Sequence, residues 1–310
     1  MATITNARGS ALVVVLAITS VLFLGCMFLV KVSKESVRTS QGLVDKLNAQ
    51  IVADSTVEAF KFLGSTGVFS TNKLVNPFGD DIGMKGEIPL DGTVAGLGEH
   101  TRIQALDAAA KLNVWGCNAG YLAKMVEILS GDDSKGSEIQ DCLLDWFDAD
   151  DLKRLNGAES YYYQTERGSL YGPRNYGAVQ CVEELSLVKG LDDPLVWARL
   201  KNELLLAPRI LPNLNTMDKT MLRAVLGISD DTADSLLATR RDRGYLDFSD
   251  VSSATGIFIS NLMDLYATGP SRIVNLSVET VSGNARESVR LLVNFRPDRE
   301  VPFRVLEAAY

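Results

Sequence analysis

The residues from Ser10 to Val30 form a run without any charged side chain or proline. At a rise of about 1.5 Å per residue, a helix of this length spans about 30 Å, which is the thickness of the hydrocarbon core of a bilayer. The run also lacks the polar face that a helix of a soluble domain presents to water. It therefore predicts a membrane-spanning helix over residues 10–30.

The junction in front of this run indicates what kind of membrane segment it is. A secretory signal peptide has an apolar run of about 7–15 residues and an A-x-A-like exit, whereas this run is longer and leaves through Lys31 without such a site. A plain single-pass anchor accounts for the run alone. The order Arg8-Gly9-Ser10 resembles the prepilin peptidase site of type IV pilins and their secretion-system relatives. That resemblance implies cleavage between Gly9 and Ser10, a leader over residues 1–9 and methylation of the new N-terminus.

One position departs from the pilin pattern. Most pilin-like proteins carry a glutamate where this chain has Val14, and the glutamate pairs with the N-terminal amine of a neighbouring subunit. A lone carboxylate at that depth in a bilayer is costly, which is why the pairing drives assembly. Val14 cannot form this pair, so a pilin-like interpretation requires a subunit that needs no neighbour in front of it.

The charges set further limits. The formal net charge is −8, which argues against binding of nucleic acid, because neutralising phosphates requires a basic face. The single histidine, His100, leaves little material for a histidine-based metal site or catalytic triad, and no G-x-S-x-G, P-loop or HExxH motif occurs. We therefore expect a protein that is not an enzyme.

The basic residues do not orient the chain in the membrane. Arg8 precedes the apolar run, whereas Lys31, Lys34 and Arg38 follow it, so the positive-inside rule does not place the N-terminus in the cytoplasm. The pilin-like junction does imply that orientation. It predicts a single-pass protein of the inner membrane whose C-terminal domain lies in the periplasm.

Helical periodicity continues beyond the membrane run. Apolar residues recur at steps of three and four up to Leu63, and the segment Gly64–Gly67 ends the pattern. We expect one helix over residues 10–63, with its first half in lipid and its second half amphipathic. Residues 64–100 are rich in glycine and are expected to form loops, and residues 102–114 are expected to form a strand, a turn and a second strand.

The middle of the chain is expected to be mostly helical. Helical segments alternate with acidic turns over residues 118–150, and Leu185–Leu206 is expected to be helical with an interruption near Gly190. From Asn213 the pattern resembles a helix–hairpin–helix unit with Gly227-Ile228 in its turn.

Helix–hairpin–helix units often bind the DNA backbone, so that function has to be weighed. Binding versions end the hairpin in a second glycine, whereas this chain has Ser229 followed by Asp230 and Asp231. Carboxylates repel phosphate, and the basic residues near Arg240 are diluted by aspartates. We interpret the unit as a packing module and expect no binding of nucleic acid.

The C-terminal tail alternates apolar and polar residues over Ile273–Val281 and Val289–Phe295, with a turn at Ser282-Gly283-Asn284. A second turn at Arg296-Pro297-Asp298 leads into Val301–Leu306. These are strand periods, and they predict an antiparallel meander. A sheet must cover its apolar face, and the long N-terminal helix is the expected partner.

An acidic cluster around Trp146 is the best candidate for a site. Like charges this close must be solvated, protonated or bound to a cation, and oxygen ligands without histidine or thiolate favour a hard cation such as calcium. The spacing is not that of an EF-hand, because Leu152 and Lys153 occupy the fifth position and the glycine position of the loop. A solvated acidic turn remains the alternative. The candidate calcium ligands are Asp145, Asp148, Asp150, Asp151 and Glu159, with Asp141 nearby.

The cysteines leave two possibilities open. Cys26 lies in the membrane run, and Cys117, Cys142 and Cys181 form an odd set in the rest of the chain. If that part lies outside the cytoplasm, one disulfide among the three with one spare thiol is plausible. Three free thiols are the alternative.

Taken in order, several short motifs are similar to those of the general secretion pathway protein K family, the minor pseudopilins of type II secretion. The resemblance begins with the junction at Gly9, which lacks the acidic residue at Val14. It continues through Leu112-Asn113, Asp145–Asp150, Asn156–Glu159, Tyr161–Tyr163, Glu184-Leu185, Val188–Gly190 and Asn213–Thr216.

The resemblance implies an α+β, pilin-like fold in which a long N-terminal helix packs on a small antiparallel sheet. A large inserted α-helical domain over residues 114–260 would contain the helix–hairpin–helix-like unit. The pilin-like core would then consist of residues 31–113 and 261–310. Bound calcium in the insertion is consistent with this family.

The implied function is that of a non-enzymatic minor pseudopilin at the tip of the pseudopilus, which caps the filament and helps to nucleate it. The implied partners are the I-type and J-type minor pseudopilins, the major pseudopilin, the prepilin peptidase and the inner-membrane assembly platform. Two alternatives remain at this point. One is a membrane-anchored helix–hairpin–helix DNA-binding protein of a competence-type uptake system, and the other is a minor type IV pilin.

Overall fold

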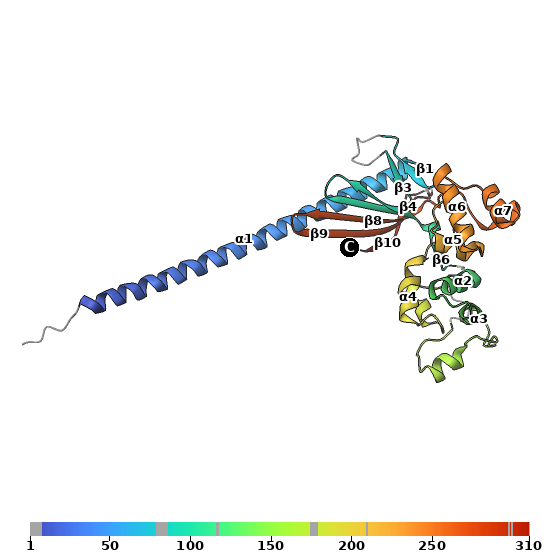
Figure 1. Cartoon of the computed structure of the whole chain (residues 1–310), viewed down its shortest axis with the longest axis horizontal. Helices are drawn as coiled ribbons and strands as arrows, with labels where there is room; N and C mark the ends of the chain where they lie inside the picture. The colour runs from blue at the N-terminus through green and yellow to red at the C-terminus, as the bar shows by residue number, and fades with distance from the viewer. Residues whose placement is uncertain are drawn as a thin grey trace, which may run out of the picture.

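The computed structural model describes residues 8–78, 86–115, 118–173, 179–208, 210–296, 298 and 300–309. Helix α1 (Arg8–Thr66) extends far out of the rest of the molecule (Figure 1). It is the one helix of the described residues that is long and apolar enough to cross a membrane. The predicted helix over residues 10–63 is therefore confirmed, with its end three residues further along the chain.

The second half of α1 packs on the pilin-like core. Ala49, Ala53, Val57, Phe60 and Leu63 recur at steps of three and four and are buried, while the remaining faces of the helix stay exposed. Gly64 permits the closest approach, because a Cβ at this position would lie 2.2 Å from the ring of Phe295.

The core sheet has five strands in the order β10-β9-β8-β5-β4, and all neighbouring pairs are antiparallel. Helix α1 packs against β8 and β9, and apolar side chains of α1 and of the sheet form one cluster. The meander predicted for the tail and its packing on the long helix are thus confirmed. The strands are β4 (Asp91–Leu97), β5 (Thr101–Asp107), β8 (Ile273–Ser282), β9 (Ala285–Asn294) and β10 (Arg304–Ala309).

The expectation of loops over residues 64–100 was wrong. This segment contains β4 and a small antiparallel sheet of β1 (Val68–Ser70), β2 (Lys73–Val75) and β3 (Glu87–Pro89). Each strand of the small sheet is only three residues long, and β4 contains glycines. None of these four strands therefore shows a clear alternation of apolar and polar residues in the sequence.

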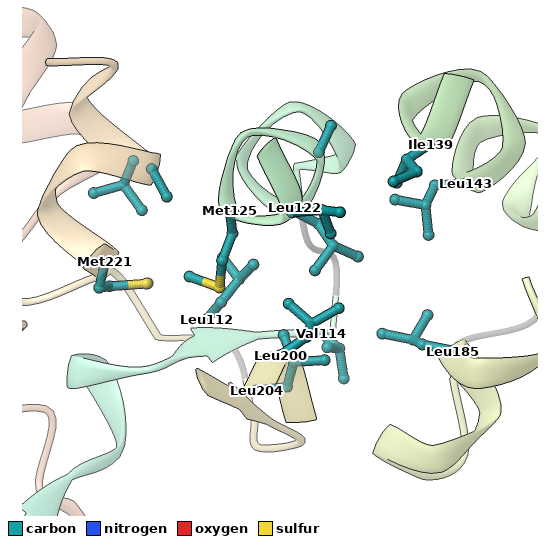
Figure 2. Packing of buried hydrophobic residues seen from close by; sticks show 14 of the residues in the cluster. Leu112, Val114, Leu122, Met125, Ile139, Leu143, Leu185, Leu200, Leu204 and Met221 are labelled. Atoms are coloured by element: carbon teal, nitrogen blue, oxygen red, sulfur yellow. The ribbon is translucent and has the colours of Figure 1, made fainter. Parts of the chain in front are cut away.

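A second body is inserted between β5 and β8, and it lies beyond the end of the sheet that is remote from the start of α1 (Figure 1). Its apolar cluster runs from Leu112 to Tyr266, slightly past the predicted bounds of 114–260 at both ends. Figure 2 shows Leu112 and Val114 facing Leu122 and Met125 in this cluster. The helices are α2 (Ala119–Ser130), α3 (Lys135–Phe147), α4 (Pro194–Leu200), α5 (Lys219–Leu226), α6 (Asp230–Arg243), α7 (Phe248–Thr255) and α8 (Ile259–Leu265).

The segment Leu185–Leu206 is less helical than predicted. A 3-10 helix over Val182–Leu187 precedes Gly190, whose φ of 88° is incompatible with a continuing right-handed helix. Helix α4 begins further on, at Pro194, and Asp193 caps its N-terminus. After the 3-10 turn Lys201–Glu203, the chain forms strand β7 (Leu204–Leu205), which pairs in parallel with β6 (Leu112–Asn113).

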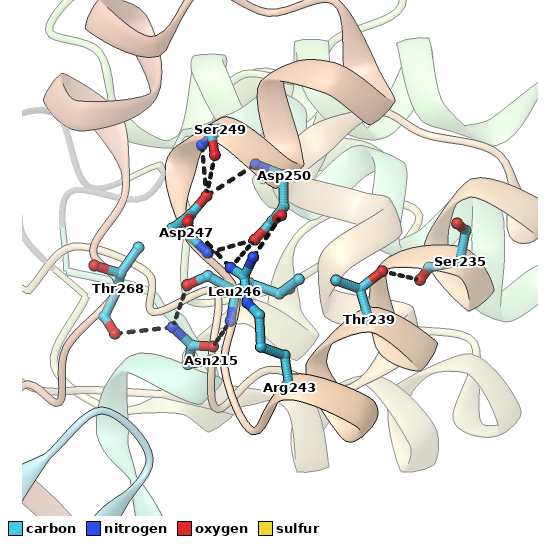
Figure 3. Close-up of polar contacts among 9 residues, drawn as sticks. All are labelled: Asn215, Ser235, Thr239, Arg243, Leu246, Asp247, Ser249, Asp250 and Thr268. Carbon is cyan, nitrogen blue, oxygen red and sulfur yellow. Dashed lines mark hydrogen bonds and ion pairs between the residues drawn. The ribbon is translucent and has the colours of Figure 1, made fainter.

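The predicted helix–hairpin–helix unit is present as α5 and α6. Gly227 ends α5 at a φ of 65°, and Ser229 caps α6 by accepting a hydrogen bond from the backbone N–H of Thr232. A second pair, α7 and α8, follows. Asn215 connects the two pairs, because its side chain binds the backbone of Leu246 and the carbonyl of Thr268 (Figure 3).

A single buried carboxylate joins the insertion to the core. Asp107, at the end of β5, is fully buried and accepts hydrogen bonds from the backbone N–H and the hydroxyl of Ser271, at the return to β8. It also accepts bonds from the Asn213 amide at 2.9 Å, the Thr216 hydroxyl at 3.3 Å and the Ala109 N–H at 3.3 Å. The two crossings between the bodies and the start of the hairpin unit are thereby fixed to each other.

We expect Asp107→Asn to destabilise the full chain by about 2–4 kcal/mol, because the new amide NH2 faces buried donors and leaves them without an acceptor. Thermal unfolding in detergent measures this loss. Asp242→Asn is the matched control, since Asp242 is exposed on α6, and it should change stability by less than about 0.5 kcal/mol. Equal stability of both variants would contradict the role of Asp107.

Candidate cation site

The candidate site lies at the C-terminal end of α3. Asp145 and Asp148 are three residues apart and therefore share a face of the helix, and Asp148 ends it with an extended backbone. Glu159 follows after a loop and precedes the π-helical turn Tyr162–Glu166. Each of the three carboxylates offers an oxygen within 4.8 Å of the others.

This group is largely removed from water. The side chain of Asp145 is fully buried and Glu159 is only 4% exposed. Trp146 packs edge-on against Tyr163 with ring centroids 5.0 Å apart, so the helix that carries Asp145 and the turn that follows Glu159 are joined by an aromatic contact. Carboxylates in such surroundings require hydrogen-bond donors, a proton or a cation.

Several carboxylate oxygens of the group receive no hydrogen bond from the described residues. Both side-chain oxygens of Glu159 and Oδ1 of Asp148 are buried and have no hydrogen-bond partner in the part of the chain that the structure describes. The pKa of Glu159 is raised to about 7, firstly by burial and then by the nearby charges of Asp145 and Asp148. An unpaired buried carboxylate among other carboxylates is the donor set that a hard divalent cation takes, so the residues fit calcium.

Among the described residues, Arg154 supplies the one positive charge that contacts the group. Its Nη1 lies 2.6 Å from Oδ1 of Asp145 and also contacts Oδ2 of Asp148. Its backbone N–H donates to Oδ2 of Asp145 at 3.2 Å. Sequence reasoning missed this residue, although the basic pair Lys153-Arg154 within an acidic segment was a visible signal.

The structure brings together three of the five proposed calcium ligands. Asp150 and Asp151 are exposed and instead bind the loop backbone: Asp150 accepts from the N–H of Leu152, and Asp151 from the N–H of Ser160. Gly157 was also missed as a requirement of the site. A Cβ at this position would lie 1.8 Å from Oδ2 of Asp145, so only glycine lets the loop pass.

Two of the three cysteines outside the membrane run are described, and both are free thiols. Cys142 is buried and Cys181 is exposed, so they do not form the predicted disulfide with each other. Burial raises the pKa of Cys142 to about 12, which keeps it protonated. Cys117, the third cysteine of the predicted set, lies outside the described residues.

The processing site stays a prediction as well. The bond between Gly9 and Ser10 falls in the first turn of α1, and the surroundings of both residues lie outside the described part. Val14 lies on the exposed, apolar part of α1 with no polar group of its own to satisfy.

Comparisons with known proteins address the fold and the family. Residues 104–239 match the family model described as "Type II secretion system (T2SS), protein K". The fold matches GspK in the crystal structure of the GspK-GspI-GspJ complex from the enterotoxigenic Escherichia coli type 2 secretion system. The TM-score is 0.54 at 17% sequence identity, over 89% of this chain and 98% of that chain. No curated protein matches the sequence.

We expect Glu159→Gln to raise the thermal midpoint of the full chain in chelator, because it removes an unpaired charge from a buried acidic group. The same variant should lose most of the calcium-dependent rise in midpoint that the wild type shows, since a ligand is missing. Differential scanning fluorimetry with and without calcium measures both effects. Asp133→Asn, which replaces an exposed carboxylate on the loop before α3, serves as the control and should change neither.

The raised pKa of Glu159 also predicts a pH dependence in chelator. The unfolded side chain titrates at a pKa of about 4.3, so between this value and about 7 the folded state binds more protons than the unfolded state. The contribution of Glu159 to stability therefore falls as the pH rises through this window and stays low above it. The midpoint of Glu159→Gln should exceed that of the wild type clearly at about pH 7.5 and hardly at about pH 5. A difference that is independent of pH would contradict this assignment.

Proposed function

The chain belongs to the general secretion pathway protein K family, and from this premise we propose that it occupies the tip of the type II secretion pseudopilus, where it caps the filament and helps to nucleate it. The position of the insertion carries this proposal. The inserted body, with its own apolar cluster from Leu112 to Tyr266, lies beyond the membrane-remote end of the pilin-like core (Figure 1). A further subunit stacked on that end would collide with it.

The membrane segment supports the same position. Val14 offers no carboxylate to the N-terminal amine of another subunit, so no subunit is recruited in front of this one by that pairing. Between the membrane span and the core, helix α1 leaves apolar side chains uncovered. Val37, Val44, Leu47 and Ile51 are exposed along one side of it, outside the predicted membrane span. Such a strip is typical of a helix that packs against neighbours.

We assign these neighbours by family. The similar complex contains GspI and GspJ beside GspK, and the I-type and J-type minor pseudopilins are accordingly the proposed partners of this chain. The major pseudopilin would lie below them. The prepilin peptidase would remove residues 1–9, and the inner-membrane assembly platform would insert the processed chain, whose C-terminal body lies in the periplasm.

Calcium bound to Asp145, Asp148 and Glu159 is part of this proposal. The unpartnered oxygens of Glu159 support it. The ion would supply charge neutralisation and fix the loop between α3 and Tyr162. No catalytic role is proposed for any residue of the chain.

The ion pairs of the hairpin unit do not favour the alternative of DNA binding. Lys219 lies 2.6 Å from Asp230 and 2.8 Å from Asp234, and Arg223 lies 3.0 Å from Asp230. Arg240 donates to the backbone carbonyls of Leu214 and Met217. These cations are engaged within the fold, whereas phosphate binding requires them to be free.

Gold labelling of pseudopili with an antibody against the insertion tests the tip position. We expect label at one end of each filament, whereas an antibody against the major pseudopilin should decorate the whole length. Label distributed along the filaments would contradict a capping role.

A pair of variants gives a second readout. Val14→Glu should lower secretion at least about tenfold, because a tip subunit has no neighbouring amine to pair with and a lone carboxylate in the bilayer costs about 2.5–3.5 kcal/mol. Val14→Leu should leave secretion unchanged. Full secretion by the glutamate variant would indicate an internal subunit instead.

A further inference from the structure

We propose that Arg154 is a built-in counter-cation, which neutralises part of the acidic site when no metal is bound and is displaced from it when calcium enters. The inference rests on the proposed calcium site and adds to it the residue that limits its affinity. The geometry around α3 carries the argument in three steps.

The first step is the position of the guanidinium. Its Nη1 bridges the two aspartates of the site, with Oδ1 of Asp145 at 2.6 Å and Oδ2 of Asp148 in direct contact. Both carboxylates are proposed metal ligands. The guanidinium therefore occupies the side of the site on which a cation would meet both aspartates, and its charge opposes the approach of another cation.

The second step is the balance of charge. One guanidinium faces three carboxylates, and both oxygens of Glu159 and one oxygen of Asp148 have no hydrogen-bond partner among the described residues. Arg154 thus neutralises the cluster only in part. A divalent ion that also reaches Glu159 satisfies more of the set, which gives the exchange its driving force.

The third step is that the side chain is able to leave without unfolding the loop. The side chain of Arg154 is 37% exposed, whereas that of Asp145 is fully buried. The loop itself is fixed by backbone donors: the N–H of Arg154 binds Asp145, and the N–H of Asn156 binds Asp141. Rotation of the guanidinium into solvent breaks neither of these bonds.

The consequence is a site whose affinity for calcium is lowered by Arg154. Calcium has to displace an internal ion pair before it binds, so the site fills only where calcium is abundant. Before that, the same ion pair holds the loop in its folded form. Exchange of one cation for the other keeps the insertion folded in both states.

Calcium titration of the full chain in detergent, by isothermal calorimetry, tests the proposal with Arg154→Gln. We expect this variant to bind calcium at least about tenfold more tightly than the wild type, because the competing charge a few Å away is gone. In chelator its thermal midpoint should fall below that of the wild type, and in saturating calcium the two midpoints should converge.

Arg243→Gln is the matched control. Arg243 also bridges two aspartates, Asp247 and Asp250, and is 39% exposed (Figure 3). No described carboxylate beside it is both buried and unpartnered. Its replacement should leave the calcium affinity unchanged. Tightening by both variants would indicate a general effect of net charge and overturn the proposal.

The remaining outcomes separate the inference from the calcium site. If the wild type binds calcium and Arg154→Gln binds it equally or more weakly, Arg154 supports the site rather than competing for it, and the inference is wrong. If neither protein binds calcium, the inference and the calcium site fall together. The tip position is decided independently by the labelling of filaments.

A measurement on the wild type does not depend on whether the variant folds. Phenylglyoxal modifies free guanidinium groups, and mass spectrometry reads its extent at each arginine. We expect Arg154 to react faster in calcium than in chelator, while Arg243 reacts equally in both. Unchanged or slower reaction of Arg154 in calcium would overturn displacement.

Discussion

The orientation of the insertion depends on one buried carboxylate. Asp107 gathers donors from the start of the insertion, from the return to the sheet at Ser271 and from the hairpin unit at Asn213 and Thr216. A small apolar cluster that includes Ala108, Leu205 and Ile273 lies beside it. Because apolar contacts are not directional, the hydrogen bonds to Asp107 decide at which angle the two bodies meet. A rigid angle is what a cap requires.

Two buried acids of this chain have opposite surroundings. Asp107 is satisfied by donors from four other residues, whereas Glu159 has none within the described residues. A fully satisfied carboxylate stabilises a fold, while an unsatisfied one stores unfavourable energy that a bound cation releases. The difference indicates a structural role for Asp107 and supports the proposal that Glu159 binds a cation, although both side chains are buried to a similar degree.

Regular periodicity predicted the elements that carry most of the pilin-like core. Helix α1 and the hairpin of β8 and β9 are long and have one clearly apolar face, so the sequence pattern identified them. Strands β1 to β3 were not predicted, because three residues are too few to show an alternation of apolar and polar side chains. For the candidate site, the density of carboxylates identified the segment in which the structure brings Asp145, Asp148 and Glu159 together. It did not separate Asp150 and Asp151 from Asp145 and Glu159, because the burial of each carboxylate depends on how the loop folds over α3.

The place of the site in the molecule connects it with the proposed function. Between α3 and α4 the described residues form only short turns of helix, and Cys181 in this stretch is a free thiol, so little regular structure holds the stretch in place. An ionic cross-link from α3 to Glu159 orders such a stretch with few residues, since it needs only three carboxylates and one cation. At the proposed tip position this part would face away from the neighbouring subunits, which would then not order it. Its shape would be set from within, by Arg154 or by the proposed calcium ion.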